Sequence, residues 1–144
     1  DVTIQAQILE LMQDLQKQLG MAIIMVTHDL GVIADMCDEI IVMYGGRVCE
    51  RGTAEDIFYP PSHEYTKGLL RSIPNIGRMG EKLVPIPGTP INLLNMPKGC
   101  AFCPRCENAM KICLTEQPPE MQVQDGHRAS CWLNVKAEME KGEV

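Results

Sequence analysis

Apolar positions near the start of the chain recur at the spacing of an α-helix. Between residues 3 and 19 they fall three or four residues apart, at Ile4, Ile8, Leu11, Met12, Leu15 and Leu19. Such a stripe is typical of an amphipathic helix that buries one face. Thr3 is suited to cap its beginning and Gly20 to end it. We therefore expect a helix over residues 3–19.

A continuous apolar run over residues 21–26 follows this helix. Bounded by glycine and by polar residues, it predicts a strand buried on both faces, as in a parallel sheet covered by helices. A short helix is expected over residues 29–37, and a second apolar strand over residues 39–44. The turn Gly45-Gly46 then leads to a hairpin partner over residues 47–51. This alternation of helices and strands predicts an α/β fold.

Two more helices are expected before residue 74, and regular periodicity ends there. Thr53 begins the first, which stops at Pro60-Pro61, and the second covers residues 62–72. Eight of the ten prolines fall from Pro74 onward. A region this irregular buries too little surface to fold unaided, so we expect a cross-link in residues 74–144.

Composition and charge exclude several classes of protein. The chain has 144 residues and a net charge of −6, without the clustered basic face that a nucleic-acid partner requires. Its apolar runs fall far short of the ~20 residues that span a membrane. The first residues do not form a secretory signal. We expect a soluble chain that docks onto other proteins.

Seven cysteines make the second half chemically distinctive. Five of them follow the spacing C-x2-C-x2-C-x6-C-x17-C, at Cys100, Cys103, Cys106, Cys113 and Cys131. An odd number cannot pair completely, and clustered thiols in a reducing compartment favour a metal over disulfides. Thiolates suit zinc or an iron–sulfur cluster, and the spacing alone leaves both open, with two disulfides as a third alternative.

Three motifs resemble ABC-transporter ATPase domains. They are DVTIQAQI at residues 1–8, similar to the end of the D-loop and the helix after it; VTHDL at 26–30, similar to the switch-histidine segment; and YGGRV at 44–48, similar to a late hairpin. Residues 59–70, 86–90, 99–106 and 127–131 are similar to the C-terminal region of oligopeptide and dipeptide importer ATPases, a group that includes nickel importers. The resemblance covers nearly the whole chain.

The resemblance implies a division of the chain. Residues 1–73 would be the C-terminal part of an ABC-type P-loop ATPase domain, and residues 74–144 an irregular, cysteine-rich, metal-binding tail. The chain would be a piece that begins at the D-loop of a longer protein. It contains no P-loop, no signature loop and no acidic strand that would hold Mg²⁺. We therefore expect the complete subunit to hydrolyse ATP and this piece alone to be inactive.

The resemblance also implies roles for individual residues. His28 would be catalytic and nucleotide-binding, holding the γ-phosphate of ATP and the attacking water, with Mg²⁺ held elsewhere in the complete subunit. Asp1 would lie at the interface between two ATPase subunits. A [4Fe-4S] cluster, or zinc as the alternative, would be held by Cys100, Cys106, Cys113 and Cys131. Cys103 would be a spare thiol or a competing ligand, and His127 a less favoured ligand.

The expected partners follow from the same resemblance. They are membrane permease subunits, a second ATPase subunit that is homologous or identical, and, indirectly, an extracellular peptide-binding protein. The subunit would lie at the cytoplasmic face of the cell membrane and power peptide import. The alternative is a metal-binding regulatory or interaction module without ATPase activity. Because the run at residues 21–26 would form an unpaired strand, we also expect this chain to self-associate.

Overall fold

The computed structural model describes residues 2–73 and 84–142, without the side chains of residues 2 and 3. The chain divides into two compact units, residues 1–38 and residues 39–144. We call them the N-terminal unit and the C-terminal unit and describe each by itself. The predicted boundary between residues 73 and 74 borders the undescribed residues 74–83 and stays a prediction. Asp1 also lies outside the described residues.

The N-terminal unit contains two helices, α1 (Val2–Leu19) and α2 (Leu30–Met36). Both were expected from the sequence and are confirmed. Helix α1 begins before Thr3, which therefore lies in its first turn and does not cap it. Gly20 follows the helix with a positive φ of 63°, a conformation that glycine adopts without steric cost. Asp29 caps α2 by accepting hydrogen bonds from two backbone N–H groups of its first turn.

The prediction of a buried strand over residues 21–26 is wrong. This segment forms no strand, and the side chains of Ile24 and Val26 are 94% and 96% exposed. A strand exists only through hydrogen bonds to a neighbouring strand, and no strand in the described part of the chain pairs with this segment. The apolar run is therefore suited to burial, but the described residues leave much of it exposed.

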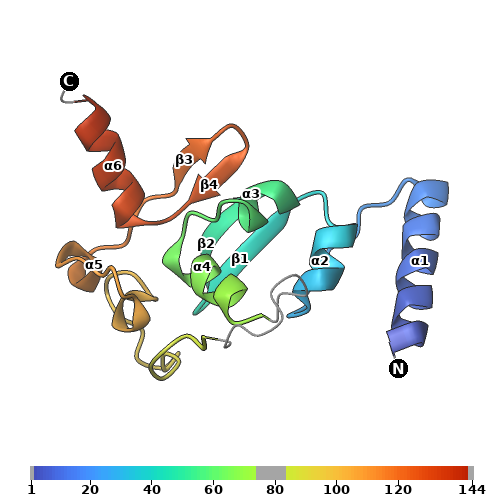
Figure 1. Cartoon of the computed structure of the whole chain (residues 1–144), viewed down its shortest axis with the longest axis horizontal. Helices are drawn as coiled ribbons and strands as arrows, with labels where there is room; N and C mark the ends of the chain where they lie inside the picture. The colour runs from blue at the N-terminus through green and yellow to red at the C-terminus, as the bar shows by residue number, and fades with distance from the viewer. Residues whose placement is uncertain (1, 74–83, 143–144) are drawn as a thin grey trace. The chain divides into compact units, whose positions relative to one another are not determined.

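The C-terminal unit is built on a four-stranded antiparallel sheet with the strand order β1-β2-β4-β3 (Figure 1). The strands are β1 (Ile40–Tyr44), β2 (Arg47–Gly52), β3 (Met121–Gln124) and β4 (His127–Ala129). The predicted hairpin of β1 and β2 is confirmed. Gly45 and Gly46 turn the chain with φ values of 58° and 74°. Two residues with positive φ match the twist of a tight hairpin turn.

Helices α3 (Ala54–Phe58) and α4 (Glu64–Arg71) follow the hairpin and confirm the two expected helices. Thr53 caps α3 in a capping box with Asp56.

No helix in the part of the chain that the structure describes is long and apolar enough to cross a membrane.

The expectation of an irregular tail is confirmed for residues 84–102 and wrong for parts of residues 103–142. Besides β3 and β4, this region contains the 3-10 helix η1 (Cys103–Arg105), α5 (Ile112–Thr115) and α6 (Trp132–Gly142). Strand β4 pairs with β2 at Glu50↔Ala129 and Arg51↔Arg128, so the tail completes the sheet begun by the hairpin. Strands of three and four residues carry too little periodicity to be recognised from sequence.

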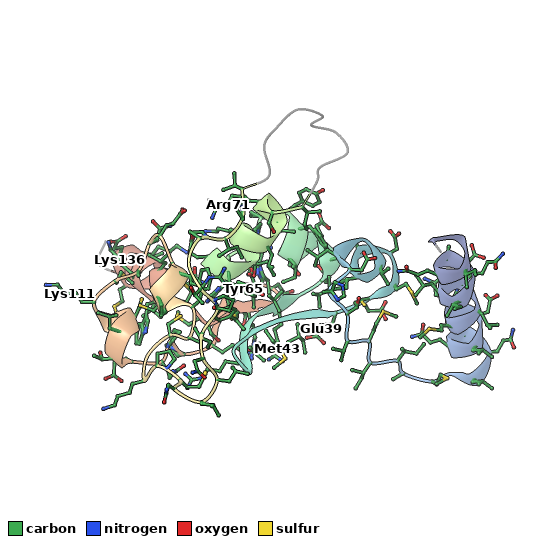
Figure 2. All side chains as sticks on the ribbon, turned by 90° about the horizontal axis from the view of Figure 1, so that it is seen from below. Glu39, Met43, Tyr65, Arg71, Lys111 and Lys136 are labelled. Atoms are coloured by element: carbon green, nitrogen blue, oxygen red, sulfur yellow. The ribbon has the colours of Figure 1, made fainter. Side chains whose placement is uncertain are left out.

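The core of the C-terminal unit lies on one face of the hairpin, where Tyr44, Cys49, Ala101 and Phe102 form a buried cluster. The rings of Tyr44 and Phe102 meet edge to face, with their centroids 5.3 Å apart. Along β1 buried and exposed residues alternate, so Met43 lies on the opposite face of the strand from this cluster and from Tyr65 (Figure 2). Two cysteines of the tail, Cys100 and Cys106, pack against this cluster.

Candidate functional site

Six of the seven cysteines belong to the C-terminal unit and come from every part of it. We call these six the thiol cluster: Cys49, Cys100, Cys103, Cys106, Cys113 and Cys131. Cys49 lies on β2, Cys103 begins η1 and Cys113 lies in α5. Cys131 joins β4 to α6. Cys49 is buried, as the sequence suggests for a small apolar residue, whereas Cys37 of the N-terminal unit is only half-buried.

A β-bulge explains why Cys49 points inward. The pairing of β1 and β2 runs from Val42↔Glu50 to Met43↔Val48, which leaves Cys49 as an extra residue. An extra residue interrupts the alternation of faces. Cys49 and Glu50 are consequently both buried, although neighbours on a regular strand would face opposite sides.

Direct backbone contact brings the loop of Cys100 against the turn of Cys113. The Cys100 N–H donates to the Cys113 carbonyl over 2.9 Å. A Cβ atom on Gly99 would lie 2.2 Å from the same carbonyl oxygen, so only glycine fits here without movement of the backbone. The Gly99 carbonyl accepts hydrogen bonds from the Arg47 guanidinium, at 3.3 Å, and from the Gln117 amide. These contacts tie β2 and the segment after α5 to the loop.

Burial raises the pKa of several of these thiols, so they are harder to deprotonate than a free cysteine. It raises the pKa of Cys49 to about 12 and that of Cys106 to about 11. Burial is also the first cause of the raised pKa of Cys100 and Cys131, and their closeness to each other and to Cys113 adds to it. Neighbouring thiolates repel one another, so charge on the cluster needs a compensating cation.

The described arrangement does not form a ready ligand set. Among the described residues, no three His, Cys, Asp or Glu side chains are grouped so that they could hold a metal ion. The four predicted ligands, Cys100, Cys106, Cys113 and Cys131, therefore lie in one region without converging on one point. Cys103 belongs to the same region and is only 7% exposed. The metal site stays a prediction.

An open pocket of about 290 Å³ lies beside the thiol cluster. It is lined by Cys49, Cys100 and His63, with Arg47, Gln117 and Ser130 as polar neighbours. The Ser130 N–H donates to the Cys49 carbonyl over 2.8 Å, which closes β4 onto β2 at this point. The pocket thus borders two cysteines and one histidine, of which Cys49 and His63 are buried and Cys100 is half-buried.

A buried carboxylate, which sequence reasoning missed, organises the other side of the core. Glu50 is fully buried and accepts hydrogen bonds from the backbone N–H groups of Ser62 and His63, at 2.5 and 2.9 Å. The Nε2 atom of His127 lies 2.7 Å from the same carboxylate, and the His127 side chain is 1% exposed. Glu50 thus connects β2, the start of α4 and β4. His127 is therefore held by Glu50, not grouped with Cys131 as a ligand.

The second buried histidine, His63, is neutral. Its Nδ1 atom accepts a hydrogen bond from the Tyr65 N–H over 3.0 Å and caps α4. Burial lowers the pKa of His63 to about 4, outweighing the attraction of Glu50 and Glu64. The sequence offered no signal for this role, because a histidine N-cap is unusual and its burial depends on the folded tail.

His28 belongs to the N-terminal unit, whereas the groups described above belong to the C-terminal unit. It follows the apolar segment of residues 21–26 and precedes α2, and its side chain is exposed. The neighbouring backbone is held by Thr27, whose hydroxyl accepts from the Asp29 N–H over 3.0 Å, and by the Asp29 cap of α2. The imidazole therefore stands exposed on a locally ordered turn.

Comparisons with known proteins agree with the resemblance seen in the sequence. Residues 49–113 match the family described as oligopeptide/dipeptide transporter, C-terminal region. The chain is 49% identical over 133 residues to the dipeptide transport ATP-binding protein DppD of Bacillus subtilis, covering 92% of this chain and 40% of that protein. It is 54% identical over 134 residues to the oligopeptide transport ATP-binding protein OppD of the same organism, covering 92% and 37%.

A relative from another organism gives a similar result. The OppD protein of Escherichia coli is 48% identical over 136 residues, covering 94% of this chain and 40% of that protein. The chain thus spans about two fifths of the length of the curated relatives that it matches. The similarity extends over both units of the chain.

Proposed function

We propose that this chain, which corresponds to the C-terminal region of oligopeptide/dipeptide transporter ATP-binding proteins, works as part of the ATP-hydrolysing subunit that powers peptide import. The observation that carries the proposal is the identity of about half over more than nine tenths of the chain to relatives named for dipeptide and oligopeptide transport. ATP and Mg²⁺ would be bound mainly by parts of the subunit outside this chain, because the chain contains no phosphate-binding loop.

His28 is the residue of this chain that we propose for the reaction itself. Its role would be to donate a hydrogen bond to the γ-phosphate and to orient the attacking water. Its exposure and its place between Thr27 and the capping Asp29 support this role, because an exposed imidazole on an ordered turn can reach a ligand. Phosphoryl transfer depends on positioning and charge stabilisation, so one oriented donor has a large effect.

The partners belong to the same proposal. Two permease subunits and a second ATPase subunit would complete the transporter, with Asp1 at the interface between the ATPases. The subunit would lie at the cytoplasmic face of the membrane, and an extracellular peptide-binding protein would deliver the cargo. The relatives' names, which refer to dipeptide or oligopeptide transport, support peptide as the cargo.

The test is a substitution in the complete subunit, assembled with its permeases. His28→Ala should lower transport-coupled ATP hydrolysis by about 100-fold or more, the usual effect of losing one transition-state donor. His28→Gln keeps an N–H donor and should lose less. The circular dichroism spectrum should stay unchanged in both variants. Full turnover in His28→Ala would remove this residue from the mechanism.

A second candidate function is a structural metal site in the tail, as an iron–sulfur cluster or zinc on Cys100, Cys106, Cys113 and Cys131. The gathering of buried thiols in one region favours it, and the lack of a convergent ligand set weighs against it. Protein purified without oxygen should show blue-violet absorbance with iron and sulfide, or bound zinc without colour. Metal-free protein that keeps its fold would end this candidate.

A further inference from the structure

The loop that carries Cys100 and the helical turn that carries Cys113 touch through their backbones. The Cys100 N–H donates to the Cys113 carbonyl over 2.9 Å. A Cβ atom on the preceding residue, Gly99, would overlap this carbonyl oxygen and would lie 2.7 Å from the carbonyl carbon of Leu114. Two successive residues of the loop therefore lie directly on two successive residues of α5.

This backbone contact sets the separation of the two cysteines. Residues that are hydrogen-bonded to each other across an antiparallel ladder have Cα atoms about 5.5 Å apart. Disulfides join Cα atoms about 4.4–6.8 Å apart. The bond between Cys100 and Cys113 thus holds their backbones within disulfide range. Burial raises the pKa of the Cys100 thiol and the nearby Cys113 thiol raises it further, so the side chains are also close.

Cys103 is the competing partner for Cys113. Burial raises the pKa of its thiol, and the nearby Cys113 thiol raises it further. Its backbone, however, bonds within its own turn, because the Cys103 N–H donates to the Cys100 carbonyl over 3.0 Å. The direct backbone bond to Cys113 therefore favours Cys100 over Cys103.

Exposure and charge also single out Cys100 as the thiol that reacts first. Of the thiol cluster, only Cys100 and Cys106 are half-buried, and the other four members are buried. Burial raises the pKa of both thiols, but the Arg47 guanidinium opposes the rise at Cys100, whereas the Glu64 carboxylate adds to it at Cys106. Because the thiolate is the reacting form, exchange begins at Cys100.

We propose that Cys100 and Cys113 form a reversible disulfide on meeting a small disulfide such as oxidised glutathione. The Cys100 thiolate attacks one sulfur of the small disulfide, whose S–S bond breaks and releases one glutathione thiolate. The Cys113 thiol then loses its proton to solvent and attacks the Cys100 sulfur, which forms the protein disulfide and releases the second glutathione. The two cysteines lose two electrons, and the small disulfide is reduced to two thiols.

The link makes the chemistry of the tail depend on its redox state. While the disulfide exists, two of the four predicted metal ligands have no free thiol, and reduction restores them. Among the residues that the structure describes, no three His, Cys, Asp or Glu side chains are grouped for a metal, so a reaction between two thiols suits the arrangement better. The inference depends neither on a bound metal nor on the proposed transport function.

The test is a disulfide map of the whole chain. Reduced protein, freed of metal by a chelator, is treated with oxidised glutathione, alkylated, digested with trypsin without reductant and measured by mass spectrometry. The main cross-link should join the peptide of residues 99–105 to that of residues 112–128. Since the first peptide holds two cysteines, Cys103→Ser should keep this cross-link and Cys100→Ser should lose it. A cross-link that persists in Cys100→Ser would overturn the assignment.

A second variant leaves every cysteine in place. Gly99→Ala should push the loop away from α5, and misplacing reacting groups by about 1 Å costs up to about 100-fold in rate, so the link should form about tenfold more slowly or more. Gly142→Ala is the matched control, because a Cβ atom there meets nothing within 4 Å and the rate should equal that of the parent. Equal rates in the two glycine variants, or the same pairing in concentrated urea as in the folded chain, would contradict the proposal.

Discussion

The two units of this chain use apolar residues in opposite ways. In the N-terminal unit no described residue is buried, and the helical stripe of Ile4, Ile8, Leu11, Leu15 and Leu19 is between 41% and 69% exposed. The C-terminal unit has a core, although its strands are short and its loops are rich in proline. Its buried residues include Glu50, His63 and His127, which are polar.

The comparison teaches that hydrophobic pattern and burial are separate properties. A regular apolar stripe forms a helix but stays exposed unless another surface covers it. An irregular segment becomes ordered when specific contacts hold it, as Gly99, Arg105 and Glu50 do here. The three predictions below change one unit at a time, beginning with the largest expected effect.

Loss of the buried carboxylate should damage the C-terminal unit most. Glu50→Gln replaces one of the two side-chain oxygens, which together accept from the Ser62 and His63 N–H groups and contact His127, with an NH₂ group. Each buried polar group left without a partner costs about 1–3 kcal/mol of unfolding free energy, and both the orphaned N–H and the new NH₂ group are affected. Denaturant unfolding followed by circular dichroism measures the change.

Glu120→Gln is the matched control for this substitution. Glu120 pairs with Arg51 and Arg128, but its side chain is 34% exposed. Exposed ion pairs contribute about 0–1 kcal/mol, so this variant should unfold almost like the parent. Equal losses in the two variants would show that burial of Glu50 has no special importance.

Acid should weaken the C-terminal unit through His63. The pKa of this histidine falls from 6.5 to about 4 on folding, so below pH 6.5 the unfolded chain binds a proton that the folded chain excludes. Above pH 6.5 the histidine is neutral in both states and does not affect stability. As the pH drops from 6.5 to 4, the unfolding free energy decreases by about 3 kcal/mol in total.

The variant His63→Asn separates this effect from other titrations. Asparagine keeps an N-cap acceptor for α4 and does not titrate. The pH dependence of its unfolding free energy should be flatter than that of the parent between pH 4 and pH 6.5. Identical slopes would mean that His63 is not the group responsible.

Substitution in the N-terminal unit should change stability least. Ile24→Ser alters a side chain that is 94% exposed, so the unfolding free energy should change by less than about 0.5 kcal/mol. We expect the exposed apolar segment to cause self-association, so this variant should self-associate less than the parent. Light scattering at high protein concentration measures the difference.

Leu94→Ser provides the control within the C-terminal unit. Leu94 is 92% exposed, but it belongs neither to the apolar stripe of α1 nor to the apolar segment of residues 21–26. Its replacement should leave self-association unchanged. A monomeric parent chain, or an equal decrease in both variants, would contradict the role of the segment.

Much of the fold was predictable, and the reasons are local. The helices α1 and α2, the hairpin around Gly45-Gly46 and the capped helix after Thr53 each follow from spacing or from one turn or cap residue. The resemblance to peptide-importer ATPases followed from short motifs, and the comparisons find the same similarity. The strand expected at residues 21–26 failed because a strand needs a partner that no local pattern supplies.

The candidate site was predictable only in part. Spacing identified the cysteines of the tail as a group, and the structure gathers them in one region without forming a ligand set. The roles of Glu50 and His127 could not be inferred, because their pairing joins residues 77 positions apart. Cys49 joined the group only through the β-bulge that turns it inward.

The sequence by itself determined the local elements, the hairpin turn, the caps and the similarity to peptide-transporter ATP-binding proteins. These depend on residues close together in the chain, whose conformational preferences act before any long-range contact forms. The tertiary structure decided which apolar residues are buried and which carboxylate meets which histidine. Those outcomes depend on contacts between segments that are far apart in the sequence. A side chain is buried, or finds its polar partner, only when another segment packs against it.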